Sequence, residues 1–142
     1  MVDIVVVHGP PGAGKSRLIA QKYADYDKLD MDDLRHELEG KGVLNSYENY
    51  RQRMNLLESR ILSLSFHKDV KVVVEGIFAP GTESYRWLVG MLKNMDLSFS
   101  FVRPEYTLAT ALRHLLIDFG KDWDEERLRG RAELLIKYHK LF

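Results

Sequence analysis

Short apolar runs and longer amphipathic segments alternate along the whole chain. The runs at 2–7 and 70–74 are continuous and rich in β-branched residues, as is typical of strands buried on both faces of a parallel sheet. Two weaker runs, at 26–29 and 97–102, also read as strands, and Pro104 ends the second of them. Between them the spacing of apolar positions predicts helices at 14–23, from Asp32 to about Gly40, and at 46–67, 82–95, 105–116 and from about 125 to the last residue.

This alternation predicts an α/β fold, a three-layer sandwich with a short parallel sheet of four or five strands. No repeat, low-complexity tract or linker interrupts residues 1–142, so one domain is expected.

The segment 46–67 carries the clearest helical stripe, whose apolar members recur at steps of three and four and are expected in the core. Three arginines, Arg51, Arg53 and Arg60, lie off that stripe. They are expected in solvent, with the alternative that one of them lines a substrate groove. The stripe consists of Tyr47, Tyr50, Met54, Leu57, Ile61 and Leu64.

Composition narrows the class of protein. Hydrophobic residues make up 45% and charged residues 30% of the 142 residues, as in ordinary soluble globular domains. The formal net charge is zero, so a strongly basic nucleic-acid binder is not indicated, although a local basic groove is compatible with it. No run approaches a membrane span, and no signal peptide or cysteine is seen, so a cytoplasmic protein that binds no membrane is expected.

The candidate chemistry begins directly after the first strand, where residues 9–16 read Gly-Pro-Pro-Gly-Ala-Gly-Lys-Ser. They match the phosphate-loop pattern G-x-x-x-x-G-K-[ST], with a strand before and a helix after, which is the context that the motif requires. Backbone N–H groups of such a loop and of the helix start bind phosphates. We therefore expect a nucleoside triphosphate, ATP, in this loop, with Lys15 on its β- and γ-phosphates and Ser16 on Mg²⁺. The predicted nucleotide contacts are Gly9, Pro11, Gly12, Ala13, Gly14, Lys15, Ser16 and Arg17.

An acidic cluster follows the second predicted strand, at the end of the sheet where open α/β folds bind ligands. Asp30 or Asp32 would cap the next helix. Asp32 also stands one turn before Arg35, which could hold the carboxylate ionised or bind a phosphate of the acceptor. A positioned carboxylate can orient an acceptor hydroxyl and take its proton, so Asp32 is a candidate catalytic residue; a simple helix cap with a surface ion pair is the alternative.

Two further features extend the site. Glu75 ends the strand at 70–74, where a carboxylate can reach Mg²⁺ or the acceptor. The polar segment at 113–124 would suit a lid that closes over the nucleotide and brings in a cation, with Arg113 and Lys121 as candidates. An ordinary connection between two helices is the alternative reading of that segment.

Taken together, these motifs resemble the small P-loop kinases, above all the 5′-hydroxyl polynucleotide kinase domain, with gluconate kinase, chloramphenicol phosphotransferase and zeta toxin in the wider group. After the P-loop, the most telling match is Met-Asp-Asp-Leu-Arg at 31–35. The resemblance makes Asp32 the general base, Arg35 a contact of the acceptor-side phosphate, Glu75 a group near the acceptor and Arg113 the lid arginine. Met31 replaces an arginine of the family and Glu75 an aspartate, and these departures concern the acceptor.

The sequence therefore predicts an ATP- and Mg²⁺-dependent phosphotransferase whose acceptor is the 5′-hydroxyl of DNA or RNA. A kinase of small molecules or nucleotides is the alternative within this class. The chain has too few acceptor-side arginines near the second predicted helix to favour a nucleoside monophosphate kinase. A nucleotide-dependent regulatory ATPase is the alternative outside it, which the acidic pair after the second strand disfavours.

Overall fold

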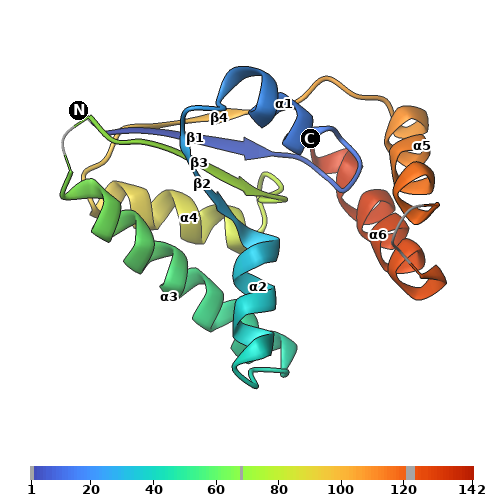
Figure 1. The fold of residues 1–142 in the computed structure, drawn as a ribbon, viewed down its shortest axis with the longest axis horizontal. Helices are drawn as coiled ribbons and strands as arrows, with labels where there is room; N and C mark the ends of the chain where they lie inside the picture. The colour runs from blue at the N-terminus through green and yellow to red at the C-terminus, as the bar shows by residue number, and fades with distance from the viewer. Residues whose placement is uncertain (1, 68, 121–123) are drawn as a thin grey trace.

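The computed structural model describes residues 2–67, 69–120 and 124–142. In this part of the chain, four parallel strands form one sheet in the order β2-β3-β1-β4, so β1 and β3 are central (Figure 1). Each strand lies where an apolar run predicts one, within one or two residues at either end. The strands are β1 (Asp3–His8), β2 (Asp27–Asp30), β3 (Lys71–Gly76) and β4 (Phe99–Val102).

Helices cover the sheet unequally. One face packs on α3 and α4, which bury their apolar stripes against the strands, and the other face packs on α1 (Figure 1). The pair α5 and α6 forms a separate small core beyond the ends toward which the strands point. The helices are α1 (Lys15–Lys22), α2 (Met31–Gly40), α3 (Ser46–Ser65), α4 (Glu83–Asn94), α5 (Leu108–Phe119) and α6 (Glu125–Tyr138), followed by a 3₁₀ turn (His139–Leu141).

The register of the sheet assembles the site. Asp30, the last residue of β2, pairs with Glu75 on β3, and His8 at the end of β1 pairs with Gly76. The strands therefore end side by side, and the segments that follow them leave the sheet at one common edge. This is where parallel sheets place their ligand sites.

Two expectations about helices are corrected. The helix expected at 105–116 begins instead at Leu108, because the Thr107 side chain caps it in a reciprocal capping box with Thr110. It continues to Phe119, so most of the predicted lid at 113–124 is the second half of α5; Lys121 lies outside the described residues. In α3 the stripe is buried as expected at Met54, Leu57 and Ile61, but Tyr47, in the first turn, is exposed.

Candidate active site

The loop between β1 and α1 has the backbone geometry of a phosphate-binding nest. Gly12 and Gly14 both have positive φ, 82° and 92°, and Gly14 is the N-cap of α1. Gly12 could not carry a side chain without meeting the backbone of Ala111 in α5. Its carbonyl oxygen also lies 2.7 Å from Nδ1 of His114, so α5 supports the loop from behind.

Lys15 is enclosed by this loop. Its ammonium group donates hydrogen bonds to the carbonyl oxygens of Gly9, at 2.7 Å, and Pro10, at 3.0 Å. Burial lowers the pKa of Lys15 to about 8, against the opposing pull of the Glu75 and Asp32 carboxylates. The side chain therefore stays mostly protonated at neutral pH, as a group that binds phosphate oxygens must.

Ser16 and Glu75 meet at the start of α1. The Ser16 hydroxyl donates to Oε1 of Glu75 at 2.8 Å, while Lys28 on β2 lies 3.3 Å from Oε2. Burial opposes ionisation of Glu75, but bonds from Asp30 and Ser16 and the nearby lysines outweigh it and lower its pKa. Hydroxyl and carboxylate oxygens are the ligands that Mg²⁺ takes in proteins, so this pair fits a magnesium ion beside the P-loop.

Asp30 belongs to the same acidic end of the site. Its Oδ1 accepts the backbone N–H of Asp32 at 2.8 Å, which makes Asp30, of the two candidates, the N-cap of α2. Burial and its neighbour Glu75 raise the pKa of Asp30 to about 6. Asp30 thus already bonds to the first turn of α2 and interacts with Glu75.

Asp32 stands one step further, in the first turn of α2, with its side chain 43% exposed. Arg131 of α6 donates to Oδ2 at 2.7 Å, and Arg35 lies 3.6 Å from Oδ1. Burial would raise the pKa of Asp32, but the charges of Arg131 and Arg35 outweigh it and hold this pKa below its usual value. Asp32 is therefore an ionised carboxylate that can reach a ligand.

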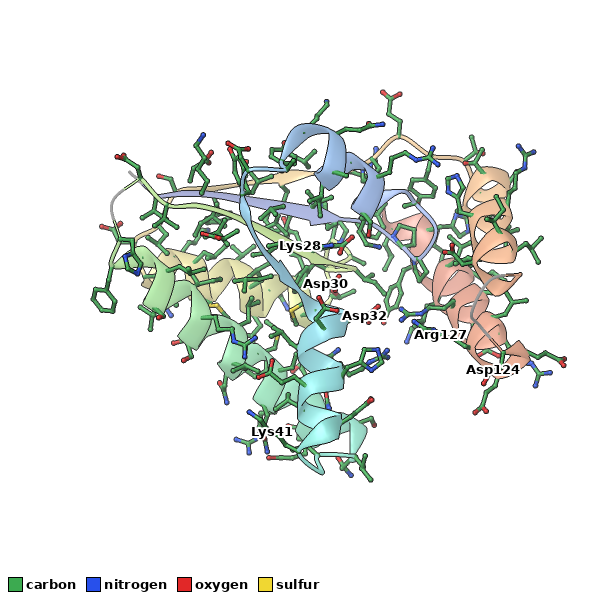
Figure 2. All side chains as sticks on the ribbon, in the orientation of Figure 1. Lys28, Asp30, Asp32, Lys41, Asp124 and Arg127 are labelled. Carbon is green, nitrogen blue, oxygen red and sulfur yellow. The ribbon has the colours of Figure 1, made fainter. Side chains whose placement is uncertain are left out.

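These groups line one cleft of about 830 Å³, a volume typical of ligand sites. Figure 2 shows Asp32 at the start of α2 and Arg127 across from it on α6, with Asp30 and Lys28 above Asp32 in this view, on β2. The cleft continues from the P-loop along α2 to the first half of α3. Its charged lining consists of Lys15, Arg17, Asp30, Asp32, Arg35, Glu39, Arg53, Glu75, Asp118, Arg127 and Arg131.

Most of the described residues that the sequence predicted for the site line this cleft, and three do not. Pro11, Gly12, Gly14, Lys15, Ser16, Arg17, Asp32, Arg35 and Glu75 all line it. Gly9 and Ala13 belong to the loop but are buried beneath it. Arg113 is exposed on α5 and does not line the cleft, so its position does not support the lid role predicted for it.

Sequence reasoning missed the two cations of α6 in the cleft, Arg127 and Arg131. Their signal is the spacing of four residues beside the apolar stripe of Leu128, Ala132 and Leu135, which puts both on one side of the helix. The sequence also favoured a solvent-exposed position for Arg53 over a place in a substrate groove, whereas in the structure Arg53 lines the cleft.

Among the described residues, no helix is long and apolar enough to cross a membrane, and no three His, Cys, Asp or Glu side chains gather around a common point to bind a metal.

The known proteins that match this chain are solved structures with a similar fold. No protein-family model and no curated protein matches the sequence. A chain of the Pnkp1/Rnl/Hen1 RNA repair complex matches 99% of this chain with a TM-score of 0.61 and 17% identity, and this chain spans 46% of its length. A gluconokinase from Sinorhizobium meliloti 1021 matches 94% with a TM-score of 0.57 and 18% identity, over 74% of that chain.

A third structure, the Mycobacterium tuberculosis APS kinase CysC in complex with AMPPNP and APS, matches 78% of this chain and 66% of its own. The TM-score is 0.59 and the identity 22%. At these identities the likeness concerns the fold. Together with the P-loop and the order of the four strands, it shows that the chain has the fold of the P-loop kinases.

Proposed function

We propose that the protein is a phosphotransferase that moves the terminal phosphoryl group of ATP to an acceptor hydroxyl positioned by Asp32. One observation carries this proposal. Asp32, kept ionised by Arg131 and Arg35, faces the same cleft as Lys15 of the P-loop. A hydrolase needs only water at this point, whereas a carboxylate flanked by arginines suits a bound acceptor with its own anionic groups.

The residues divide the reaction between them. The P-loop backbone and Lys15 hold the β- and γ-phosphates, and Ser16 and Glu75 would hold Mg²⁺, which neutralises charge on the phosphates. Asp32 accepts a hydrogen bond from the acceptor hydroxyl, which aligns its oxygen with the γ-phosphorus. The new O–P bond forms as the bond to the bridging oxygen breaks, ADP leaves, and the hydroxyl proton passes to the Asp32 carboxylate.

A carboxylate with a lowered pKa is a weak base, which this chemistry tolerates. Phosphoryl transfer has a loose transition state in which positioning and charge neutralisation matter more than early proton removal. Arg131 and Arg127 of α6 are the cations best placed to neutralise the transferring group, in the role that the sequence assigned to Arg113.

For the acceptor we propose the 5′-hydroxyl end of a polynucleotide. The support is the group of arginines that line the cleft beside Asp32, with Arg35 and Arg53 on one wall and the α6 arginines on the other. A small phosphorylated molecule is the alternative acceptor for the same arginines.

The test is transfer of radiolabelled γ-phosphate from ATP to a panel of acceptors: 5′-hydroxyl DNA, 5′-hydroxyl RNA, nucleotides and uncharged sugars. Label on an oligonucleotide, lost on blocking its 5′-hydroxyl, is the expected result. Asp32→Asn should leave ATP affinity near that of the original protein and lower turnover by roughly 10²–10⁴-fold. Rapid ATP hydrolysis that no acceptor stimulates and Asp32→Asn does not slow would instead indicate an ATPase.

A further inference from the structure

Four buried polar atoms without a hydrogen-bond partner among the described residues gather in one part of the cleft. They are Nε of Arg35, Oδ1 of Asn49, the hydroxyl oxygen of Tyr50 and Nε of Arg53. All four residues line the cleft, one from α2 and three from the facing side of α3. Buried polar groups are normally bonded, and leaving one unbonded costs about 1–3 kcal/mol. Three of the four, the two arginine Nε–H groups and the Tyr50 hydroxyl, can donate, and together they indicate a ligand with an acceptor group that bonds to them.

The charges at this point favour an anion. No carboxylate of the described residues is within ion-pair distance of the Arg53 guanidinium, although Asp32 and Glu39 act on it from further away. The guanidinium lies 5.9 Å from the centroid of the Tyr50 ring. Burial, and then the like charge of Arg35, lower the pKa of Arg53. Two cations thus share a partly desolvated space. Arg35 also has Glu39 at 3.8 Å and Asp32 at 3.6 Å, so Arg53 is the less neutralised of the pair.

The surrounding contacts fix this geometry. Asn49 is buried, and its Nδ2 donates to the carbonyl oxygens of Arg35, at 3.4 Å, and Val43, at 3.1 Å, which ties α3 to α2. Tyr50 packs edge-on against Trp87 of α4 with ring centroids 5.5 Å apart. The Tyr50 ring and the packing of α3 on α2 are therefore held in place before any ligand binds, which reduces the entropy that binding loses.

We propose that Arg53 and Tyr50, together with Arg35, form a subsite that binds a phosphate-like group carried by the acceptor. We call these three residues the anion subsite. This inference rests on the proposed function only in that the molecule is an acceptor. Arg35 stands one helical turn, about 5 Å, from Asp32. The anionic group therefore lies close to the hydroxyl that reacts, and Arg53 makes the enzyme select acceptors that carry both groups.

Two sources can supply such a group: the phosphomonoester of a small molecule and the phosphodiester of a polynucleotide. Transfer rates with a nucleoside, its 3′-monophosphate and a 5′-hydroxyl dinucleotide separate them. For either source, Arg53→Gln should raise the acceptor KM at least tenfold, leave the KM for ATP unchanged and affect the unphosphorylated nucleoside little. Arg53→Lys should recover part of the loss.

A binding experiment is independent of turnover. Inorganic sulfate is titrated into the protein with excess ADP and Mg²⁺ occupying the P-loop, while the arginine Nε–H signals are followed by NMR. The Arg53 signal should shift to saturation, with affinity at least tenfold weaker in Arg53→Gln and a few-fold weaker in Tyr50→Phe. Arg51→Gln is the matched control, because Arg51 lies on the same helix, pairs with Glu48 and does not line the cleft.

The outcomes separate the two proposals. Equal sulfate affinity in the original protein, Arg53→Gln and Tyr50→Phe would overturn the anion subsite, whatever the activity. Saturable binding that depends on Arg53, in a protein that transfers phosphate to no acceptor, would uphold the subsite and reject the kinase. Should Arg53→Gln fail to fold, Arg53→Lys and Tyr50→Phe carry the same comparison.

Discussion

Alanine substitutions at two glycines of the P-loop, Gly12 and Gly14, test whether α5 packs against the loop. Both Gly12 and Gly14 have positive φ, so alanine at either costs about 1–2 kcal/mol of backbone strain. A Cβ on Gly14 would have nothing within 4 Å, whereas one on Gly12 would lie 3.0 Å from the carbonyl carbon of Ala111 and closer still to its oxygen. Backbone atoms cannot rotate away as a side chain can, so the loop or α5 must shift.

Forced overpacking of this kind costs typically another 1–3 kcal/mol. We therefore expect Gly12→Ala to lose at least about 1 kcal/mol more unfolding free energy than Gly14→Ala, or roughly 2–4 °C of Tm for a chain of this size. Because Gly14 also caps α1, its replacement carries an additional cost, which makes the comparison conservative.

Urea unfolding of both variants without nucleotide measures this difference, since it excludes any loss of phosphate binding. Equal stability of the two variants would refute the reasoning, because it would mean that α5 does not rest against Gly12. The hydrogen bond between His114 and the Gly12 carbonyl oxygen would then also be absent, and the α5–α6 pair would be free to move relative to the loop.

Three further predictions concern the charged groups of the site. Burial lowers the pKa of Lys15 to about 8, while bound phosphates favour its charged form. ADP should therefore bind with proton uptake, and its affinity should fall as the pH rises above about 8. Calorimetry in buffers of different ionisation enthalpy tests this, and binding without proton uptake would contradict it. Arg131→Gln removes one of the two arginines whose charges together outweigh burial at Asp32. The pKa of Asp32 should therefore rise, and the acidic limb of the pH–rate profile should move to higher pH. An unmoved limb would exclude Asp32 as the titrating group. Glu75→Gln keeps an acceptor for the Ser16 hydroxyl but removes the negative charge, so the Mg²⁺ concentration for half-maximal rate should rise about tenfold or more, and an unchanged requirement would place the metal elsewhere.

The parts of the site that local sequence determines could be predicted. The P-loop is a continuous motif whose glycines and lysine act through their own backbone and its immediate neighbours. Glu75 lies at the end of β3 and Asp32 follows β2, and parallel strands end together, so their meeting at one edge follows from the fold class. The sequence could not decide whether Asp30 or Asp32 is the N-cap of α2, because both are aspartates and cap equally well. The position of the strand end, at Asp30, decides which of them caps the helix.

Arg131 shows what a local sequence pattern cannot predict. Arg131 reaches Asp32 across 99 residues of chain, and no spacing within α6 announces its partner. The exposed position of Arg113 was open to prediction, since Ala111 and Leu115 mark the buried side of α5 and Arg113 lies between them in sequence, on the far side of the helix. Arg53 likewise lies off the apolar stripe of α3, but whether such a position faces solvent or a cleft depends on α2, which packs beside it.

The zero net charge of the chain hides an uneven distribution of charge in this cleft. The acids Asp30 and Glu75 lie with Ser16 at the P-loop end, where a divalent cation would reverse the local sign. The arginines lie beyond Asp32, with Arg35 and Arg53 on one wall and Arg131 on the other. A chain with zero formal charge can thus present one end suited to metal-bound triphosphate and another suited to an anionic acceptor. Asp32, at the boundary between the two ends, is the carboxylate that both can reach.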